Sequence, residues 1–200
     1  SHDLRNPLSV ISFSSEALLR AWAAETERAA ERRQLEGIAL STQRMRRLIN
    51  DLLDVARVDA GRMSVEPVPV PAERLILDAL EMHAPLAEDR AILTRVRLPA
   101  EAPPVLADPD RVLQVLSNLL GNAIRFTPRG GGITLSAEVE EGHVRFAVSD
   151  TGPGIPPDHL PHIFDRFWRG QRARGQGAGL GVAIARGIVE GHEGRIWAES

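Results

Sequence analysis

Two successive segments at the start of the chain carry small or apolar residues at alternating spacings of four and three. In the first segment these residues are Leu4, Leu8, Ile11, Ser15, Leu18 and Trp22, and in the second they are Leu35, Ile38, Thr42, Met45, Ile49, Leu52 and Ala56. The alternation is typical of the seam along which helices pack in a bundle. A charged stretch over residues 25–33 separates the segments, and Gly61 is a suitable cap for the second helix. We therefore expect residues 1–61 to form a helical hairpin.

Two helices alone provide too little core to be stable. Two hairpins can form a symmetric homodimer with a four-helix bundle, which would bury both seams. Alternatively, a single hairpin can pack on the domain that follows it. The pattern of residues leaves both arrangements open.

The remaining chain, residues 62–200, combines short apolar strands with amphipathic helices, and we expect the domain boundary near Arg62. Strands are predicted over residues 63–71, 91–98, 133–139, 144–148 and 194–199, and helices over residues 72–90, 110–126 and 180–190. Pro85 should kink the first helix or end it early, since proline has no backbone N–H. Asp108 followed by Pro109 is a strong start for the second helix. The pattern predicts an α/β domain.

The first eight residues, Ser-His-Asp-Leu-Arg-Asn-Pro-Leu, contain a candidate nucleophile. The neutral imidazole of His2 can attack phosphorus near neutral pH, and the adjacent carboxylate of Asp3 can fix its tautomer. Asn6 lies one helical turn from His2 on the same face. Pro7 should distort this turn. A solvated polar face is the alternative explanation of this group.

The helix predicted over residues 110–126 carries a polar stripe, Gln114, Asn118, Asn122 and Arg125, opposite its apolar side. Asparagine is a poor helix former, so two of them one turn apart suggest a function. A neutral amide oxygen can bind Mg²⁺ without repelling a triphosphate, and an arginine can pair with phosphate oxygens. The stripe is either a nucleotide-binding surface or a polar face turned to water.

Asp150 ends the strand predicted over residues 144–148, and Gly152 and Gly154 follow it. A carboxylate there can accept a hydrogen bond from the exocyclic amine of adenine, and glycines let a flat ring approach the backbone. Guanine has a carbonyl at the equivalent position, so such a site should favour ATP over GTP. A plain loop is the alternative.

Glycines at positions 175, 177, 179 and 181 lead into the helix predicted over residues 180–190. N–H groups at a glycine-rich helix start attract phosphate. The spacing does not match a Walker loop, because no Gly-Lys-Ser/Thr follows, and no strand precedes it as in a Rossmann motif.

Taken in order, these stretches resemble the five sequence boxes of sensor histidine kinases of bacterial two-component systems. Residues 1–8 resemble the H-box, 118–128 the N-box, 150–155 the G1-box, 164–169 the F-box and 177–184 the G2-box. The resemblance covers nearly the whole chain. It implies a dimeric four-helix bundle over residues 1–61, followed over residues 62–200 by an α/β sandwich of the histidine-kinase/Hsp90-like ATPase type.

The resemblance also implies what lies outside this sequence. Members of the family have more helix before the H-box and one further strand at the end, so we expect the chain to be a fragment of a longer sensor. It would be the cytoplasmic portion of a protein anchored in the inner membrane through upstream segments, and itself soluble.

The resemblance implies ATP and Mg²⁺ as ligands. Asn122 would bind the metal, and the nucleotide site would also include Asn118, Arg125, Asp150, Gly152, Gly154, Gly177, Gly179, Leu180 and Gly181. The family often has lysine where Arg125 stands, and the arginine keeps the positive charge.

The same resemblance implies autophosphorylation of His2, with Asp3 orienting its ring, and transfer of the phosphoryl group to an aspartate in the receiver domain of a response regulator. Asn6 would position a water for dephosphorylating that regulator.

Composition argues against several other functions. The formal net charge of -3 predicts no general affinity for nucleic acid or an anionic membrane. The chain has no cysteine, which excludes disulfides and thiolate catalysis. No apolar run reaches the roughly 20 residues that a membrane span requires. His159 and His162 lie three positions apart, but no third metal ligand is evident.

Two other functions remain open. A different ATPase of the same superfamily, or a kinase acting on serine, would not need His2 together with Asp3 and Asn6. A non-enzymatic scaffold that only dimerises should have lost Asn122 or Asp150, and the chain has both.

Overall fold

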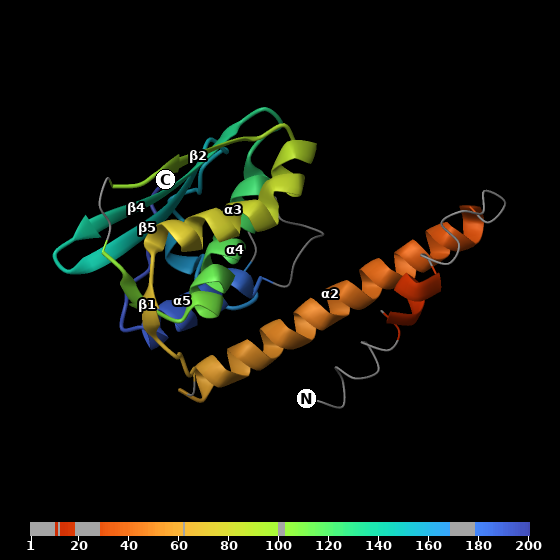
Figure 1. The fold of residues 1–200 in the computed structure, drawn as a ribbon, viewed down its shortest axis with the longest axis horizontal. Coiled ribbons are helices and arrows are strands. Elements are labelled where there is room, and N and C mark those ends of the chain that lie inside the picture. The colour runs from red at the N-terminus through yellow and green to blue at the C-terminus, as the bar shows by residue number, and fades with distance from the viewer. Residues whose placement is uncertain (1–10, 12, 19–28, 62, 100–102, 169–178) are drawn as a thin grey trace. The chain divides into compact units, whose positions relative to one another are not determined.

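The computed structural model describes residues 11, 13–18, 29–61, 63–99, 103–168 and 179–200 (Figure 1). The chain divides into two compact units, residues 1–57 and residues 58–200. This division falls within the last turn of helix α2 (Ala29–Asp59), close to the boundary expected near Arg62.

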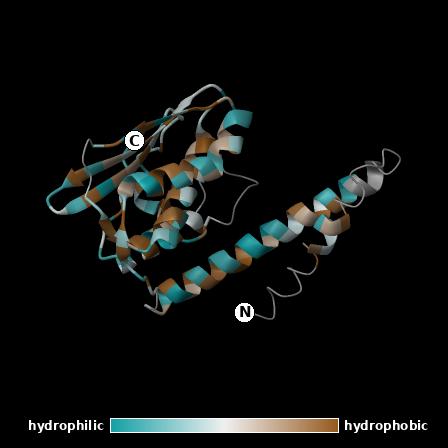
Figure 2. Ribbon diagram, in the orientation of Figure 1, coloured by the Kyte–Doolittle hydropathy of each residue, from teal (hydrophilic) through white to brown (hydrophobic). Residues whose placement is uncertain are grey.

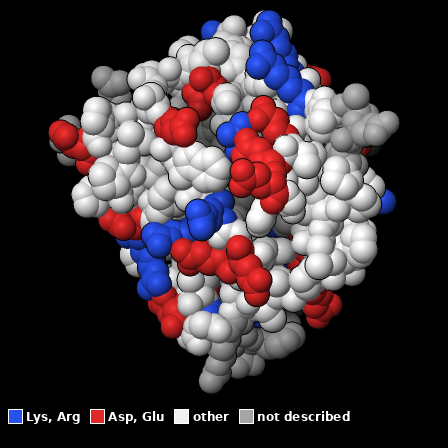
Figure 3. Space-filling model, turned by 90° about the vertical axis from the view of Figure 1, so that its left-hand side faces the viewer, with Lys and Arg blue, Asp and Glu red and all other residues white. Residues whose placement is uncertain are grey.

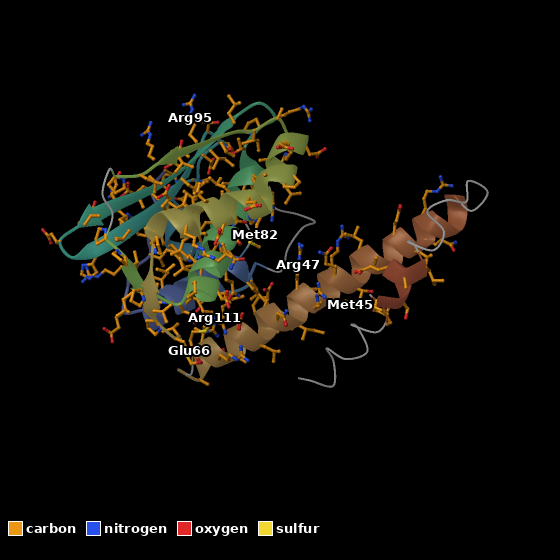
Figure 4. The ribbon with its side chains drawn as sticks, in the orientation of Figure 1. Met45, Arg47, Glu66, Met82, Arg95 and Arg111 are labelled. Carbon is orange, nitrogen blue, oxygen red and sulfur yellow. The ribbon has the colours of Figure 1, made fainter. Side chains whose placement is uncertain are left out.

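Helix α2 makes up most of the described part of the first unit, and residues 13–18 are also helical. Thr42, in the predicted seam, is buried, and its hydroxyl donates to the carbonyl of Ile38 at 2.8 Å. In contrast, Ile38, Met45 and Leu52 are 44%, 45% and 51% exposed. Figure 2 shows apolar positions recurring along α2 between hydrophilic ones, and Figure 4 labels Met45 on its surface. Within the described residues, the seam of a single chain is therefore only partly covered.

The second unit contains two small sheets. Strands β1 (Val68–Val70) and β3 (Val105–Ala107) pair antiparallel, whereas β2 (Leu93–Arg97), β4 (Gly132–Glu140) and β5 (His143–Asp150) form a sheet in the order β2-β4-β5. In the larger sheet β2 runs parallel to β4, and β4 runs antiparallel to β5. The turn between β4 and β5 has positive φ at Glu141 (44°) and Gly142 (84°), as tight hairpins require.

Three helices lie on one side of the larger sheet (Figure 1): α3 (Ala72–Asp89), α4 (Pro109–Phe126) and α5 (Gly181–Gly191). Alternate residues of β4 are buried, as expected for a sheet that has only one covered face. The largest fully buried side chains of the core are Ile76, Leu116, Leu120, Ile133, Leu135, Leu180, Ile184 and Ile188. This arrangement confirms the predicted α/β domain.

Several details differ from the sequence-based expectation, among them strand β3, which was not predicted. The edge strand expected over residues 63–71 is limited to Val68–Val70. Helix α3 continues through Pro85 to Asp89, so of the two expected effects of Pro85, a kink or an early end, the early end is wrong. Pro85 and Glu81, whose carbonyl loses its partner, are both exposed, so water can bind that carbonyl. The strand expected over residues 194–199 is also absent, because this segment forms no ladder with any described strand.

The surface of the second unit mixes both signs of charge. On the face shown in Figure 3, arginines and carboxylates are interspersed. Arg145 on β5, for example, pairs with Glu138 and, at 3.2 Å, with Glu140. In the described part of the chain, no helix is sufficiently long and apolar to cross a membrane.

Asp51 on α2 offers a test of the first unit. Its pKa is raised above the usual value by burial and by the nearby charge of Asp54, against a smaller lowering by Arg47. The folded chain thus holds this proton more tightly than the unfolded chain does, so ionised Asp51 destabilises the fold and stability falls as the pH rises through this pKa. We expect Asp51→Asn to raise Tm at pH 7, with a gain that shrinks as the pH is lowered towards 4.

Asp54→Asn is the matched control for this measurement, made by circular dichroism. Asp54 is buried and accepts a charge-assisted hydrogen bond from Arg57 at 3.1 Å. Its substitution should lower stability by about 1 kcal/mol. A lower Tm at pH 7 in Asp51→Asn would contradict the inference that ionised Asp51 destabilises the fold.

Candidate functional site

Helix α4 carries the predicted polar stripe, and backbone hydrogen bonds fix its N-terminal end. Asp108 is the N-cap: one carboxylate oxygen accepts from the backbone N–H of Arg111 and the other from that of Glu66, both at 3.1 Å. Pro109 follows, where its missing N–H has no intrahelical partner to lose. Figure 4 shows Glu66 and Arg111 near this end of the helix. The cap therefore ties the start of α4 to the segment that precedes β1.

His192, directly after α5, binds the same end of α4. Its Nε2 accepts from the backbone N–H of Asp108 at 2.9 Å, so the neutral ring carries its proton on Nδ1, which donates to the carbonyl of Ile188 at 2.8 Å. The ring thus bridges the last turn of α5 and the N-cap of α4. Sequence reasoning missed this contact, because a histidine after a helix suggests only a local cap and its partner lies 84 positions earlier.

The polar stripe touches the start of α5. Its residues, Gln114, Asn118, Asn122 and Arg125, are half-buried, and the opposite side of α4 lies in the core. Asn118 Nδ2 donates to the carbonyl of Gly181 at 3.0 Å. A Cβ at Gly181 would lie 3.2 Å from Asn118 Oδ1. Asn118 therefore holds the backbone at the first residue of α5.

The backbone just before α5 requires glycine. Gly179 has a φ of 71°, and a Cβ there would lie 2.7 Å from the carbonyl oxygen of Trp168. The carbonyl of Gly179 accepts from the backbone N–H of Phe167 at 2.9 Å. Leu180 is fully buried and anchors this turn in the core. No described side chain caps α5, so its first N–H groups are suited to a phosphate.

Asp150 ends β5 in a tight turn. Its Oδ1 accepts from the backbone N–H of Gly152 at 2.7 Å, whereas its Oδ2 has no hydrogen-bond partner within the described ranges. A Cβ at Gly152 would lie 2.6 Å from Asp150 Oδ1 and 3.2 Å from the carbonyl oxygen of Phe126. Gly154 has a φ of 71°. The exposed carboxylate is therefore oriented by its own turn, and the turn lies against the end of α4.

Two segments that are far apart in sequence thus meet at α4. Gly181 contacts Asn118 in the middle of the helix, and Gly152 contacts Phe126 at its end. Between these contacts lie Asn122 and Arg125. Together, α4, the Asp150 turn and the start of α5 provide an amide oxygen, a guanidinium, a carboxylate oxygen and N–H groups that no described side chain caps. This set suits a purine nucleotide with phosphates. The predicted residues His2, Asp3, Asn6 and Gly177 lie outside the described residues.

The side chains at this site offer few oxygen ligands for a metal ion, so a bound nucleotide would have to supply most of them. Among the residues that the structure describes, no three His, Cys, Asp or Glu side chains form a cluster. The neutral amide oxygen of Asn122 is an oxygen ligand of the kind that a hard cation such as Mg²⁺ takes. His162 and His159 have other contacts: His162 lies 2.9 Å from Asp165, and the ring of His159 packs edge-on against Trp168 at 5.2 Å.

Comparisons with known proteins cover both units. Residues 1–61 match the His Kinase A (phospho-acceptor) domain, and residues 107–200 match the histidine kinase-, DNA gyrase B-, and HSP90-like ATPase family. The adaptive-response sensory kinase SasA of Synechococcus sp. (strain JA-3-3Ab) is 35% identical over 201 residues, which cover all of this chain and 53% of that kinase. The chain therefore spans about half the length of this curated relative.

Solved structures agree with these matches. Full-length ShkA in complex with AMPPNP is 33% identical, with a TM-score of 0.76 over 95% of this chain and 39% of its own. The histidine kinase ThkA in complex with the response regulator TrrA is 25% identical, with a TM-score of 0.67 over all of this chain and 55% of its own. These matches confirm the predicted order of domains, a helical hairpin followed by an ATPase-type α/β domain.

Gly179 provides a test of this backbone geometry. Gly179→Ala should lower the free energy of unfolding by more than about 1 kcal/mol, because alanine must adopt a positive φ and its Cβ meets the Trp168 carbonyl. Gly121→Ala is the matched control, since Gly121 lies within α4 and a Cβ there has open space. It should raise stability by up to about 1 kcal/mol. Urea unfolding measures the change in the free energy of unfolding for both variants. Equal changes would contradict the strained backbone inferred at Gly179.

Proposed function

The chain belongs to the sensor histidine kinases, and from this premise we propose that it is the phosphorylating core of such a kinase. It uses ATP to phosphorylate His2 and passes the phosphoryl group to an aspartate of a response regulator. The observation that carries this proposal is the meeting of the Asp150 turn, the α4 stripe and the glycine-rich start of α5.

In the proposed site, Asp150 Oδ2 accepts a hydrogen bond from the exocyclic amine of adenine, because Oδ1 already accepts one from the N–H of Gly152. Gly152 and Gly154 leave room for the base against the backbone. This arrangement selects ATP, since the carbonyl that guanine presents at that position would repel the carboxylate. The complex of ShkA with AMPPNP supports an adenine nucleotide as the ligand in this family.

At the other end of the site, Arg125 and the N–H groups at the start of α5, which no described side chain caps, hold the phosphates. Asn118 keeps these N–H groups in register with α4 through Gly181. Asn122 would hold Mg²⁺, which when bound would neutralise the charge that develops on the transferred phosphoryl group. The residues therefore act mainly by positioning and charge stabilisation.

His2 is the proposed acceptor. One ring nitrogen forms a bond to the γ-phosphorus while the bond from phosphorus to the β–γ bridging oxygen breaks, and ADP leaves with that oxygen. Asp3 holds the proton of the other ring nitrogen and stabilises the positive charge that develops on the ring. In the second step the phosphoryl group moves from His2 to the aspartate of the response regulator, which restores the neutral imidazole. Asn6 positions a water when the phosphorylated regulator is hydrolysed.

Two partners follow from this proposal. A second copy of the chain packs on residues 1–61, because Ile38, Met45 and Leu52 leave an apolar stripe of α2 exposed in the described part of one chain. The receiver domain of a response regulator is the second partner, and the complex of ThkA with its regulator supports this choice.

The phosphorylation assay compares the chain with a His2→Gln variant, using ATP labelled at the γ-phosphate and Mg²⁺. We expect an acid-labile, base-stable label on the chain and none on the variant, while both bind ATP equally. Label that persists in His2→Gln would favour a kinase acting on serine. A chain that binds ATP but stays unlabelled would contradict the proposed activity and favour a scaffold.

Base selectivity tests Asp150. Asp150→Asn can still accept the N–H of Gly152 but loses the negative charge, so we expect about tenfold weaker ATP binding and less discrimination against GTP. Asp158→Asn is the control, because Asp158 is also an exposed carboxylate in the loop that follows β5. Calorimetric titration with both nucleotides measures the effect. Unchanged selectivity in Asp150→Asn would exclude Asp150 from adenine recognition.

A further inference from the structure

Arg90, the residue that follows α3, binds the C-terminal end of α4. Its Nη1 donates to the carbonyl of Ile124 at 2.5 Å and to that of Arg125 at 2.9 Å, and the residue is half-buried. The last carbonyls of a helix have no partner within the helix. Arg90 provides this partner from a position more than thirty residues earlier in the chain.

The charge of Arg90 favours the same contact. The C-terminal end of a helix carries partial negative charge, so a cation placed there stabilises the last turn. The planar guanidinium is always protonated and keeps its donors in a fixed geometry. One nitrogen bound to two successive carbonyls therefore restrains both the position and the winding of this turn.

The contact belongs to a wider junction between the ends of two helices. The carbonyl of Arg90 accepts from the backbone N–H of Gly130 at 3.2 Å. Arg129 donates in return to the carbonyl of Asp89, the last residue of α3, at 2.7 Å. Each helix end is therefore capped by an arginine from the segment that follows the other helix. Only the turn capped by Arg90 carries residues of the candidate site.

We propose that Arg90 is a positioning residue for nucleotide binding: it holds the last turn of α4 so that Asn122 and Arg125 meet the triphosphate. The proposal rests on the proposed function. Asp108 and His192 fix the opposite end of α4, so Arg90 completes the restraint of the helix. Without it the last turn frays, and the two side chains lose their fixed place.

The test uses the full chain with Arg90→Met, Arg90→Lys and, as the matched control, Arg129→Met. Hydrogen exchange of the amides of residues 122–126 reports on the last turn of α4. Calorimetry with AMPPNP and Mg²⁺ reports on the site. We expect Arg90→Met to speed exchange in this turn and to weaken AMPPNP binding, each by about tenfold. Arg90→Lys should recover part of both, and Arg129→Met should change neither by more than about twofold.

A double substitution separates positioning from general destabilisation. In an Arg125→Met background, Arg90→Met should weaken AMPPNP binding by less than about threefold, because the side chain that it positions is already gone. Losses that multiply fully would overturn the proposal, as would exchange that stays at the level of the unmodified chain. If Arg90→Met does not fold, the same two measurements are made on Arg90→Lys, for which we expect smaller changes in the same direction. If the unmodified chain bound no AMPPNP, the proposed function would fail, while the exchange data would still decide whether Arg90 holds the turn.

Discussion

The second unit depends on how α4 is held at its N-terminal end. The carboxylate of Asp108 binds two backbone N–H groups, its own N–H binds His192, and that ring binds the end of α5. A helix start has N–H groups without intrahelical partners; here His192 accepts from that of Asp108 and the Asp108 carboxylate accepts from that of Arg111. The apolar side of the helix fills the core with Leu116 and Leu120. Burial fixes which side of α4 faces inward, and the cap fixes where the helix begins, so together they place the polar stripe.

Glycine at two positions lets the other segments reach α4. At Gly181 and Gly152 a Cβ would press on a side chain or a carbonyl of α4 or its neighbouring turn, so the backbone itself forms the contact. In such contacts the backbone geometry sets the direction of the N–H groups at the start of α5 and of the Asp150 carboxylate. A site ordered in this way needs little rearrangement of side chains when a ligand binds, which lowers the entropic cost of binding.

The sequence predicted the parts of this arrangement that depend on local patterns. The Asp108–Pro109 start, the amphipathic α4 with its polar stripe, and the hairpin ending at Asp150 follow from capping chemistry and periodicity. The contacts of His192 and Arg90 could not be predicted, because each joins segments whose proximity depends on the whole fold. The expected strand at residues 194–199 failed for a related reason: a strand forms only beside a neighbouring strand, and the sequence does not show which segments lie side by side.

Most contacts that shape the site end on backbone atoms. Asp108, His192 and Asn118 each bind an N–H or a carbonyl of another segment. Because every residue except proline offers both groups, the residue that receives such a contact can change without loss of the bond. The side chain that makes the contact cannot, and neither can a glycine at a close approach. The architecture therefore restricts a small set of donors, acceptors and glycines, and leaves the surrounding surface free to vary.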